Sequence, residues 1–366
     1  MNRTLGLIST NFSLGDFGVL TAERPEAALP FGGRYRLLDF ALSNLVNARI
    51  QTVGLITPYF YRSIMDHVGA GKEWGLDRKD GGLYILPGTV YGFRETDGPF
   101  LFRDFLHNDR FFRQGDGDYV LVTSGAMAAN IDFQPMIAQH EMSGDHVTLL
   151  YRPTREEDRH DGYFLTVSDG GRVTAVTPGD DGDCRFLDSF IIDRTLMLRL
   201  LRDFESLGRM DFMEILRLVL EDVHVGAFRF DGYIAPMKNA RDYLRSNMDL
   251  QDPDIRHELF GQGRQILTKI HDAPPSLYAD GSRVRNSVVA SGCVIEGSVE
   301  NCVIFRSVRI EKGVSLKNCV VMDKCIIRTG AQLENVICDR YVTVSPDTCI
   351  KGTAQSPCVL PKGGVI

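Results

Sequence analysis

The chain has 366 residues, of which 43% are hydrophobic and 24% charged, an ordinary soluble composition with room for two domains. Its formal net charge of −7 and its pI near 5.7 argue against nucleic acid as a partner, because phosphate-backbone binding needs clustered Lys and Arg. No apolar run approaches the roughly eighteen residues of a membrane-spanning helix, and the start of the chain lacks the apolar core of a signal peptide. We therefore expect a cytoplasmic protein that binds neither nucleic acid nor membrane.

Seven of the eight cysteines lie in the last quarter of the chain. None of them forms a C-x-x-C pair, so the sequence predicts no zinc site. Disulfides are also unexpected in a reducing compartment, and we interpret these cysteines as small buried hydrophobic residues.

The first part of the chain alternates short β-rich apolar runs with amphipathic stretches. This alternation predicts an α/β, Rossmann-like layer domain over residues 1–250, with a mostly parallel sheet. The expected strands are residues 4–9, 53–57, 119–123, 147–151 and 190–193, and the expected helices are residues 133–142 and two that begin near Thr195 and Asp211.

The last part of the chain has a different period. After a polar connector at residues 251–280, valine and isoleucine recur every six residues over 281–366, with breaks in phase. A hexapeptide period with small residues at the corners predicts a left-handed parallel β-helix. A sandwich of short strands is the alternative, but no Asn-Gly hairpin signal occurs here.

Some hexapeptide β-helix proteins are acyltransferases that use a histidine base. The last histidine of this chain is His271, which precedes the repeat. The sequence therefore favours a structural or assembly role for the β-helix.

The segment Pro30–Asn44 reads P-F-G-G-R-Y-R-L-L-D-F-A-L-S-N. Its two glycines permit a tight turn, two arginines follow at a spacing of two, and an apolar run comes next. Taken alone, it describes a turn that enters a core helix.

This segment closely resembles the signature of the glucose-1-phosphate adenylyltransferases (ADP-glucose pyrophosphorylases), in which P-F-G-G-K-Y-R-I-I-D-F-x-L-S-N follows a nucleotide-binding loop. That family also places a nucleotidyltransferase domain before a β-helix, so the resemblance covers nearly the whole chain. It implies attack of glucose-1-phosphate on ATP, with a divalent metal held by aspartates.

Matching the chain to that signature shows that its phosphate-binding positions have changed. Counted back from Pro30 without gaps, the family's arginine falls on Asp16 and its lysine on Glu26, while its first glycine pair falls on Asn11 and Phe12. At about 4 Å from a phosphate charge, a carboxylate costs on the order of 4 kcal/mol at an effective dielectric near 20. The residues still available for a residual ligand pocket are Thr21, Arg24, Gly32 and Gly33.

The family's two metal-binding aspartates fall on Ala126 and Pro236, neither of which can ligate magnesium through its side chain. The family's E-K-P, whose lysine meets the sugar phosphate, has no counterpart near residues 176–178. We interpret Asp132, Asp188 and Asp193, carboxylates near predicted strand ends, as caps or surface residues. The sequence thus predicts no metal site, no cofactor and no catalytic residue.

A retained scaffold with lost chemistry resembles the non-catalytic, regulatory subunits of this family. The resemblance implies that the chain is not itself an enzyme and pairs with a catalytic adenylyltransferase subunit of glycogen biosynthesis, as a heterotetramer. It also implies an anionic effector between the domains, for which Arg34, Arg36 and Arg49 are candidates; the alternative for Arg34 is solvation, and for Arg36 it is a structural pair with Asp39. An active sugar-nucleotide pyrophosphorylase with displaced metal ligands, and a self-contained structural or sensing protein, are the alternative functions.

Overall fold

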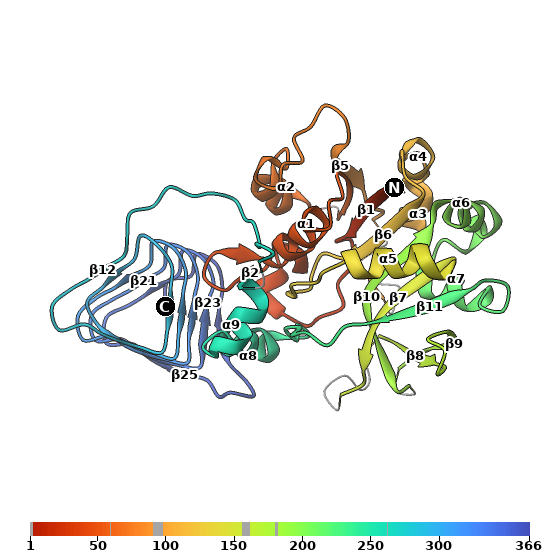
Figure 1. The fold of residues 1–366 in the computed structure, drawn as a ribbon. Helices are drawn as coiled ribbons and strands as arrows, with labels where there is room; N and C mark the ends of the chain where they lie inside the picture. Colours follow the sequence, from red (N-terminus) through yellow and green to blue (C-terminus); the bar gives the residue numbers. More distant parts are fainter. Residues whose placement is uncertain (1–2, 59, 91–97, 156–161, 180–181, 262) are drawn as a thin grey trace.

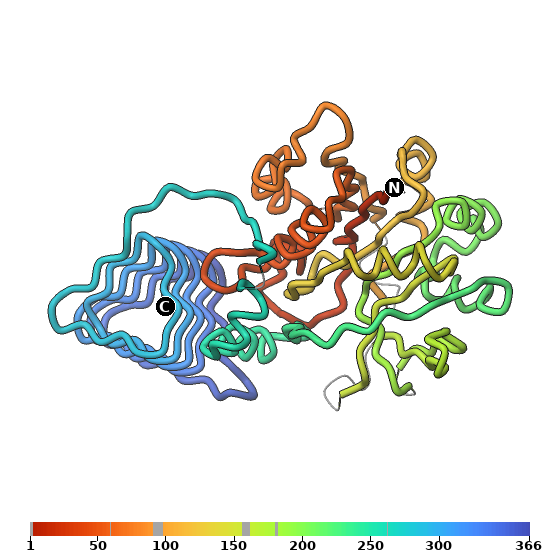
Figure 2. Tube along the Cα trace, in the orientation of Figure 1, coloured from red at the N-terminus to blue at the C-terminus, as the bar shows by residue number. Residues whose placement is uncertain are grey.

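The computed structural model describes residues 3–58, 60–90, 98–155, 162–179, 182–261 and 263–366. It has two parts that lie side by side, a layered α/β domain and a prism of stacked coils (Figure 1). The chain passes from the first to the second through two helices and a long connecting segment (Figure 2). The predicted fold class is confirmed.

Within the described residues, a nine-stranded sheet forms the centre of the α/β domain, in the order β11-β7-β10-β6-β1-β4-β5, with β8 and β9 beside β10. The pairs β1–β4, β1–β6, β4–β5 and β7–β11 are parallel, whereas β10 is antiparallel to its neighbours. The strands are β1 (Thr4–Ser9), β4 (Thr52–Thr57), β5 (Gly82–Pro87), β6 (Tyr119–Ser124), β7 (Val147–Pro153), β8 (Tyr163–Val167), β9 (Val173–Pro178), β10 (Cys184–Asp193) and β11 (Val225–Arg229).

The five predicted strands are all present, because each is an apolar run that the sheet buries on both faces. One face is covered by an aromatic-rich core and the other by an aliphatic one. The helices are α1 (Leu37–Asn47), α2 (Arg62–Val68), α3 (Phe102–His107), α4 (Asp109–Gln114), α5 (Gln134–Ser143), α6 (Arg194–Asp203) and α7 (Phe212–Leu218), with short 3-10 turns at η1 (Gly18–Thr21), η2 (Glu26–Ala28), η3 (Lys72–Trp74) and η5 (Glu205–Leu207).

In residues 263–366, three parallel five-stranded sheets form the faces of a left-handed β-helix. Branched side chains fill its interior together with five of the seven cysteines, which are buried as predicted. Cys358 is only partly buried and Cys349 is exposed, so the prediction is wrong for Cys349. One sheet holds β12 (Leu277–Tyr278), β15 (Val294–Ile295), β18 (Arg309–Ile310), β21 (Ile326–Ile327) and β24 (Thr343–Val344). The second holds β13 (Arg283–Arg285), β16 (Ser298–Glu300), β19 (Ser315–Lys317), β22 (Gln332–Glu334) and β25 (Cys349–Lys351), and the third holds β14 (Val288–Val289), β17 (Val303–Ile304), β20 (Val320–Val321), β23 (Val336–Cys338) and β26 (Cys358–Leu360).

One corner of the β-helix carries a ladder of asparagines. Each of four asparagines there has a positive φ and donates its side-chain amide to the next coil, and successive asparagines are spaced by 15 and then by 17 residues. Such a tight corner favours asparagine, which tolerates the left-handed region. The ladder consists of Asn286, Asn301, Asn318 and Asn335, and it begins on Gln251 of the α/β side and ends on the carbonyl of Gly352.

The two domains share a continuous apolar core. The hairpin of β2 (Pro30–Phe31) and β3 (Tyr35–Arg36) lies against the β-helix, flanked by α8 (Ala240–Asp249) and α9 (Pro253–Phe260) (Figure 1). The predicted connector therefore contains a helix, and the first coil starts at Leu277, inside the range assigned to the connector. In the part of the chain that the structure describes, no helix is both long and apolar enough to cross a membrane.

Candidate ligand cavity and domain junction

A cavity of about 670 Å³ opens at the end of the α/β sheet where β6 and β10 meet the segment that precedes α8. Its walls come from four parts of the chain: residues 12–14 with Glu26, residues 124, 126 and 127 at the end of β6, residues 185–188 within β10, and residues 234–238. Residues 99, 152, 162, 178 and 179 complete the lining.

Ala126 and Pro236 both line this cavity, although 110 positions separate them in the sequence. The two positions matched to the family's metal-binding aspartates therefore lie in one cavity. An alanine methyl group and a proline ring offer no oxygen ligand to a hard cation. Among the described residues, no three His, Cys, Asp or Glu side chains come together as a possible metal set. The residues at these two positions do not fit a magnesium ion.

Residues 11 and 12, which match the family's first glycine pair, both carry buried side chains. Phe12, at a position where the family has glycine, is buried and lines the cavity. The side chain of Asn11 donates to the carbonyl of Thr89 at 2.9 Å and to the carboxylate of Asp104 at 2.8 Å. Glycines let a ligand approach the backbone closely, whereas a phenylalanine stands at the second of these positions here.

The buried side chain of Glu26 is hydrogen-bonded to the loop at residues 11–16. Its carboxylate accepts a hydrogen bond from the backbone N–H of Gly15 at 2.8 Å, and it also interacts with Ser13 and the N–H of Leu14. The side chain is only 5% exposed, and burial raises the pKa of Glu26 to about 7 although these hydrogen bonds act in the opposite direction. An internal carboxylate thus takes the N–H donors that a phosphate would need.

The cavity also contains cationic residues that the sequence reasoning missed. Arg152 on β7, Arg185 on β10 and Lys238 line it together with two carboxylates, Glu26 and Asp188. Arg152 and Arg185 are directly opposed across the antiparallel β7–β10 pair. The pairing of two strands could have revealed them, but the strand register is not visible in the sequence.

Asp16, unlike Glu26, does not line the cavity. It is exposed, and its backbone N–H donates to the carbonyl of Lys238 at 2.8 Å. None of the four residual pocket candidates lines the cavity. Thr21 bonds the carbonyl of Gly18 at 3.4 Å, and Gly32 and Gly33 form the hairpin turn that meets the β-helix near Val288 and Ile304.

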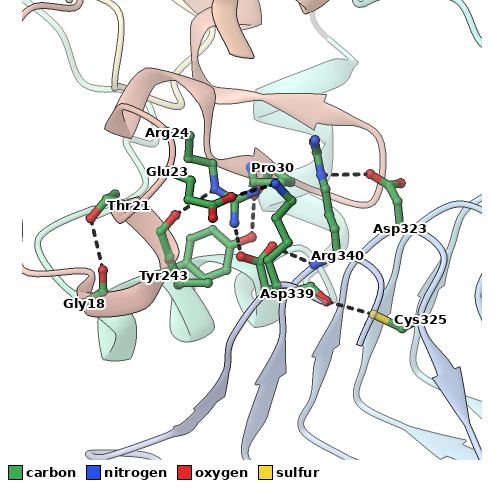
Figure 3. Close-up of polar contacts among 12 residues, drawn as sticks. Gly18, Thr21, Glu23, Arg24, Pro30, Tyr243, Asp323, Cys325, Asp339 and Arg340 are labelled. Atoms are coloured by element: carbon green, nitrogen blue, oxygen red, sulfur yellow. Dashed lines mark hydrogen bonds and ion pairs between the residues drawn. The ribbon is translucent and has the colours of Figure 1, made fainter. Parts of the chain in front are cut away.

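Arg24 forms a buried ion pair with Asp339 of the β-helix instead of lining the pocket (Figure 3). The two side chains are 8% and 1% exposed. Arg24 also donates to the carbonyl of Leu20, and Asp339 accepts from the N–H of Arg340 at 2.6 Å. This residue, retained from the nucleotide signature, therefore joins the two domains.

Two of the three effector candidates lie together at the domain junction. Arg34 is exposed beside the ring of Tyr35, and Arg36 donates to the carbonyl of Ser63. Burial lowers the pKa of Arg36 to about 9, and nearby Arg340 acts in the same direction. The expected structural partner of Arg36, Asp39, accepts from its backbone N–H at 2.9 Å and pairs with buried His67.

Arg49 is not part of this group. It is exposed and follows the opposite end of α1, an eleven-residue helix about 16 Å long. The structure therefore separates Arg49 from the other two candidates.

The β-helix adds charges to the junction that the sequence analysis did not consider. Arg306, Asp323 and Arg340 are spaced by 17 residues and form a column along the coils. Asp323 accepts from the N–H of Arg306 at 3.2 Å and pairs with Arg340 at 3.4 Å. Burial and the nearby Arg34 lower the pKa of Arg306, while Asp323 partly offsets them. The 17-residue coil was the signal that could have found this column.

Of the three strand-end carboxylates, Asp132 accepts from the N–H of Gln134 at 3.0 Å and pairs with Arg264 at 3.5 Å, while Phe133 stands at the N-cap of α5. Asp193 immediately precedes α6, 3.6 Å from buried His140. Asp188 differs, because it lines the cavity and has a positive φ of 42°.

Comparison with known proteins places this geometry in a family. Residues 19–177 match the model described as nucleotidyl transferase, and residues 277–356 match the model described as GlmU-like, C-terminal hexapeptide. The chain is 38% identical over 362 residues to the glycogen biosynthesis protein GlgD of Bacillus subtilis, covering 99% of this chain and 96% of that protein. The chain belongs to the GlgD family of glycogen biosynthesis proteins.

Further relatives agree with this assignment. GlgD of Geobacillus stearothermophilus is 34% identical, covering 100% of this chain and 97% of its own length. The glucose-1-phosphate adenylyltransferase of Thermotoga sp. strain RQ2 is 32% identical, covering 87% of this chain and 77% of that enzyme. The resemblance found in the segment Pro30–Asn44 is thus confirmed over the whole chain.

Proposed function

We propose that this GlgD-family chain is a non-catalytic, regulatory subunit of glucose-1-phosphate adenylyltransferase. It would assemble with a catalytic homologue, as a heterotetramer, and modulate the synthesis of ADP-glucose from ATP and glucose-1-phosphate. Its eight free thiols suit the reducing cytoplasm, where we expect this assembly to work.

The observation that carries this proposal is the state of the cavity. Ala126 and Pro236 stand at the two positions matched to metal-binding aspartates, and both face the same space. Glu26 adds a carboxylate where phosphate charge would have to be neutralised, and it already holds the N–H of Gly15. Phosphoryl chemistry depends on positioning and charge stabilisation, and this wall supplies neither in the family's manner.

The junction supports the regulatory part of the proposal. Arg34 and Arg36 of the hairpin approach Arg306 and Arg340 of the β-helix, with Asp323 between the two coil arginines. A group of guanidiniums suits a phosphorylated effector, because each can bind phosphate oxygens in a forked arrangement. The complex containing Arg34→Ala is expected to lose part of its effector response, and an unchanged response would exclude this site.

An activity assay of the purified chain tests the first part. With ATP, glucose-1-phosphate and magnesium, we expect no ADP-glucose above background. Robust turnover would contradict the proposal. It would favour an active transferase with displaced ligands, for which Glu26 and Asp188 are the carboxylates in the cavity.

Co-expression with the catalytic homologue from the same host tests the partner role. We expect the two chains to co-purify and the activity or effector response of the homologue to change. If they elute separately and the homologue behaves identically with and without this chain, the subunit role fails.

A further inference from the structure

We infer that one flat face of the β-helix docks the catalytic partner, and that Arg309 at its centre selects this partner over a second copy of the same chain. The face is the outer side of the sheet of β12, β15, β18, β21 and β24, called here the β12 face, and it lies away from the α/β domain (Figure 1). The inference rests on the proposed function, because it names the surface through which that assembly forms.

The side of the β-helix that contacts the α/β domain shows what a covered face of this prism looks like. In the sheet of β14, β17, β20, β23 and β26, the outward residues of successive coils are register partners and form an unbroken apolar column. This column packs into the core shared by the two domains. Its members are Val288, Val303, Val320, Ile337 and Val359.

The sheet of β13, β16, β19, β22 and β25 has the opposite character. One of its outward columns alternates in charge from coil to coil, and two of the neighbouring pairs form ion pairs at 3.9 and 4.0 Å. The column consists of Arg285, Glu300, Lys317, Glu334 and Lys351. Opposite charges on adjacent strands stabilise each other in water, so this face needs no protein partner.

The β12 face resembles the covered face more than the charged one. Leu277 is 61% exposed, and Val294 and Ile326 are partly exposed. An exposed apolar column of this kind is typical of a surface that another protein covers. The outward register partners, from the first coil to the last, are Leu277, Val294, Arg309, Ile326 and Thr343.

Arg309 interrupts this apolar column at its middle strand, β18. The side chain is exposed, and it forms no ion pair with any residue that the structure describes. The acid that follows on the same coil, Glu311, is already paired with Arg328 at 2.9 Å. The guanidinium of Arg309 is therefore available to a carboxylate of another chain.

Symmetry makes Arg309 a barrier to self-association through this face. Two copies related by a two-fold axis can pair their five-stranded faces in a parallel or an antiparallel sense, and in both cases the middle strand meets its own copy. Two guanidiniums would then oppose each other within an apolar contact, where like charges repel.

A homologous β-helix avoids this repulsion when it presents an acidic side chain to Arg309. Its coils have the same spacing of about 4.8 Å, so its apolar rows can match those of the β12 face one by one. Attraction to one partner combined with repulsion of the other gives specificity. The occupant of the β12 face is therefore the catalytic homologue.

Association of the full-length chain with the catalytic homologue from the same host, measured by sedimentation and by biolayer interferometry, tests the inference. Arg309→Glu should weaken association at least tenfold, because its carboxylate would face the acid of the partner. Ile326→Lys should also weaken association, through the loss of an apolar contact. Lys317→Glu, on the same coil but on the charged face, is the matched control and should leave association unchanged.

A second measurement needs no partner. Arg309→Leu completes the apolar column, so the isolated variant should form a larger assembly than the wild-type chain at the same concentration. Arg309→Lys keeps the charge and should behave like wild type. If Arg309→Leu does not self-associate beyond wild type, the selective role of Arg309 is overturned.

The outcomes separate this inference from the proposed function. Thermal unfolding first establishes that each variant is folded. If folded Arg309→Glu binds the homologue as tightly as wild type does, the inference is overturned and the proposed function stands. If the wild-type chains do not associate at all, both are overturned. Slower hydrogen exchange at residues 294–295, 309–310 and 326–327 in the complex would support the docking face directly.

Discussion

The cavity wall and the domain junction are built from the same stretch of chain, yet they differ in what they retain. Residues 12–14 and Glu26 line the cavity, and there an aromatic ring and an acid stand where the family signature has a glycine and a lysine. Only a few residues later, the hairpin at Pro30–Arg36 keeps the family signature and packs into the core shared with the β-helix. Within this segment, the residues that line the cavity depart from the family signature, and the residues that join the domains keep it.

This difference explains why a signature that resembles a nucleotide-binding motif says little about catalysis. Gly33 turns against Val288 and Ile304, and the hydroxyl of Tyr243 donates to the carbonyl of Pro30. Arg24 pairs with Asp339. Each of these contacts is a packing requirement, which holds whether or not the cavity binds ATP.

The largest effect on stability is expected when the charge of Asp339 at the domain junction is removed. Asp339→Asn would leave the guanidinium of Arg24 buried without its counter-ion, and breaking a buried pair typically costs about 3 to 5 kcal/mol. We expect a correspondingly large loss in the free energy of unfolding, measured by denaturant titration.

The matched control is a second, exposed ion pair between the domains, Glu23 with Lys362, whose side chains are 71% and 47% exposed. Lys362→Met should cost less than about 1 kcal/mol, as exposed pairs usually do. If Asp339→Asn lowers the free energy of unfolding no more than Lys362→Met does, the buried ion pair does not stabilise the domain junction.

A substitution of Glu26, in the cavity wall, should instead raise the free energy of unfolding. Burial raises the pKa of Glu26 from 4.5 to about 7, so between these pH values the folded chain binds more protons than the unfolded chain. The free energy of unfolding attributable to this group therefore falls as the pH rises through that window. Glu26→Gln should be about 2 to 3 kcal/mol more stable than wild type at pH 8 and equally stable at pH 4.

Thermal unfolding of both proteins across this pH range checks the prediction. A glutamine amide can still accept from the N–H of Gly15, so the hydrogen bond is not the variable. A stability difference that does not change with pH would show that the charge of Glu26 has no part in the effect.

The smallest effect is expected at the hairpin turn. Gly33 has a φ of 82°, and a Cβ there would meet Ile304, Ala290 and Val288 at ordinary distances of 3.6 to 3.7 Å. Gly33→Ala should lower the free energy of unfolding by about 1 kcal/mol, from backbone strain alone. Gly144→Ala, with a φ of 69° and open space around it, should cost the same, and a much larger cost at Gly33 would reveal a tighter junction.

The sequence predicted the two domains because their periodicities differ and because apolar runs mark the strands. The matched positions Ala126 and Pro236 also meet in one cavity, since the signature fixes how the loops are arranged around the sheet. The antiparallel position of β10 and the opposition of Arg152 and Arg185 depend on strand register, which a single sequence does not encode locally.

The assignment of Arg24 to a ligand pocket had a different weakness. Its partner Asp339 lies 315 residues away, and only the docking of the β-helix brings the two together. Arg49 was grouped with Arg34 because the resembled family has basic residues at the matching positions, although a helix separates the two arginines here. In both cases the role of the side chain depends on long-range contacts that the sequence does not show.

The asparagine ladder has a consequence for how such a β-helix can grow or shrink. The coil from Asn286 to Asn301 is two residues shorter than the 17-residue coils that follow, yet the ladder continues across it. The shortening falls between β15 and β16, at Glu296 and Gly297, on a different corner from the asparagine ladder. The corner at Gly297 therefore accepts a change in coil length, while the asparagine corner keeps successive coils aligned. Coils can gain or lose residues at the Gly297 corner without disturbing the face of the β-helix that contacts the α/β domain.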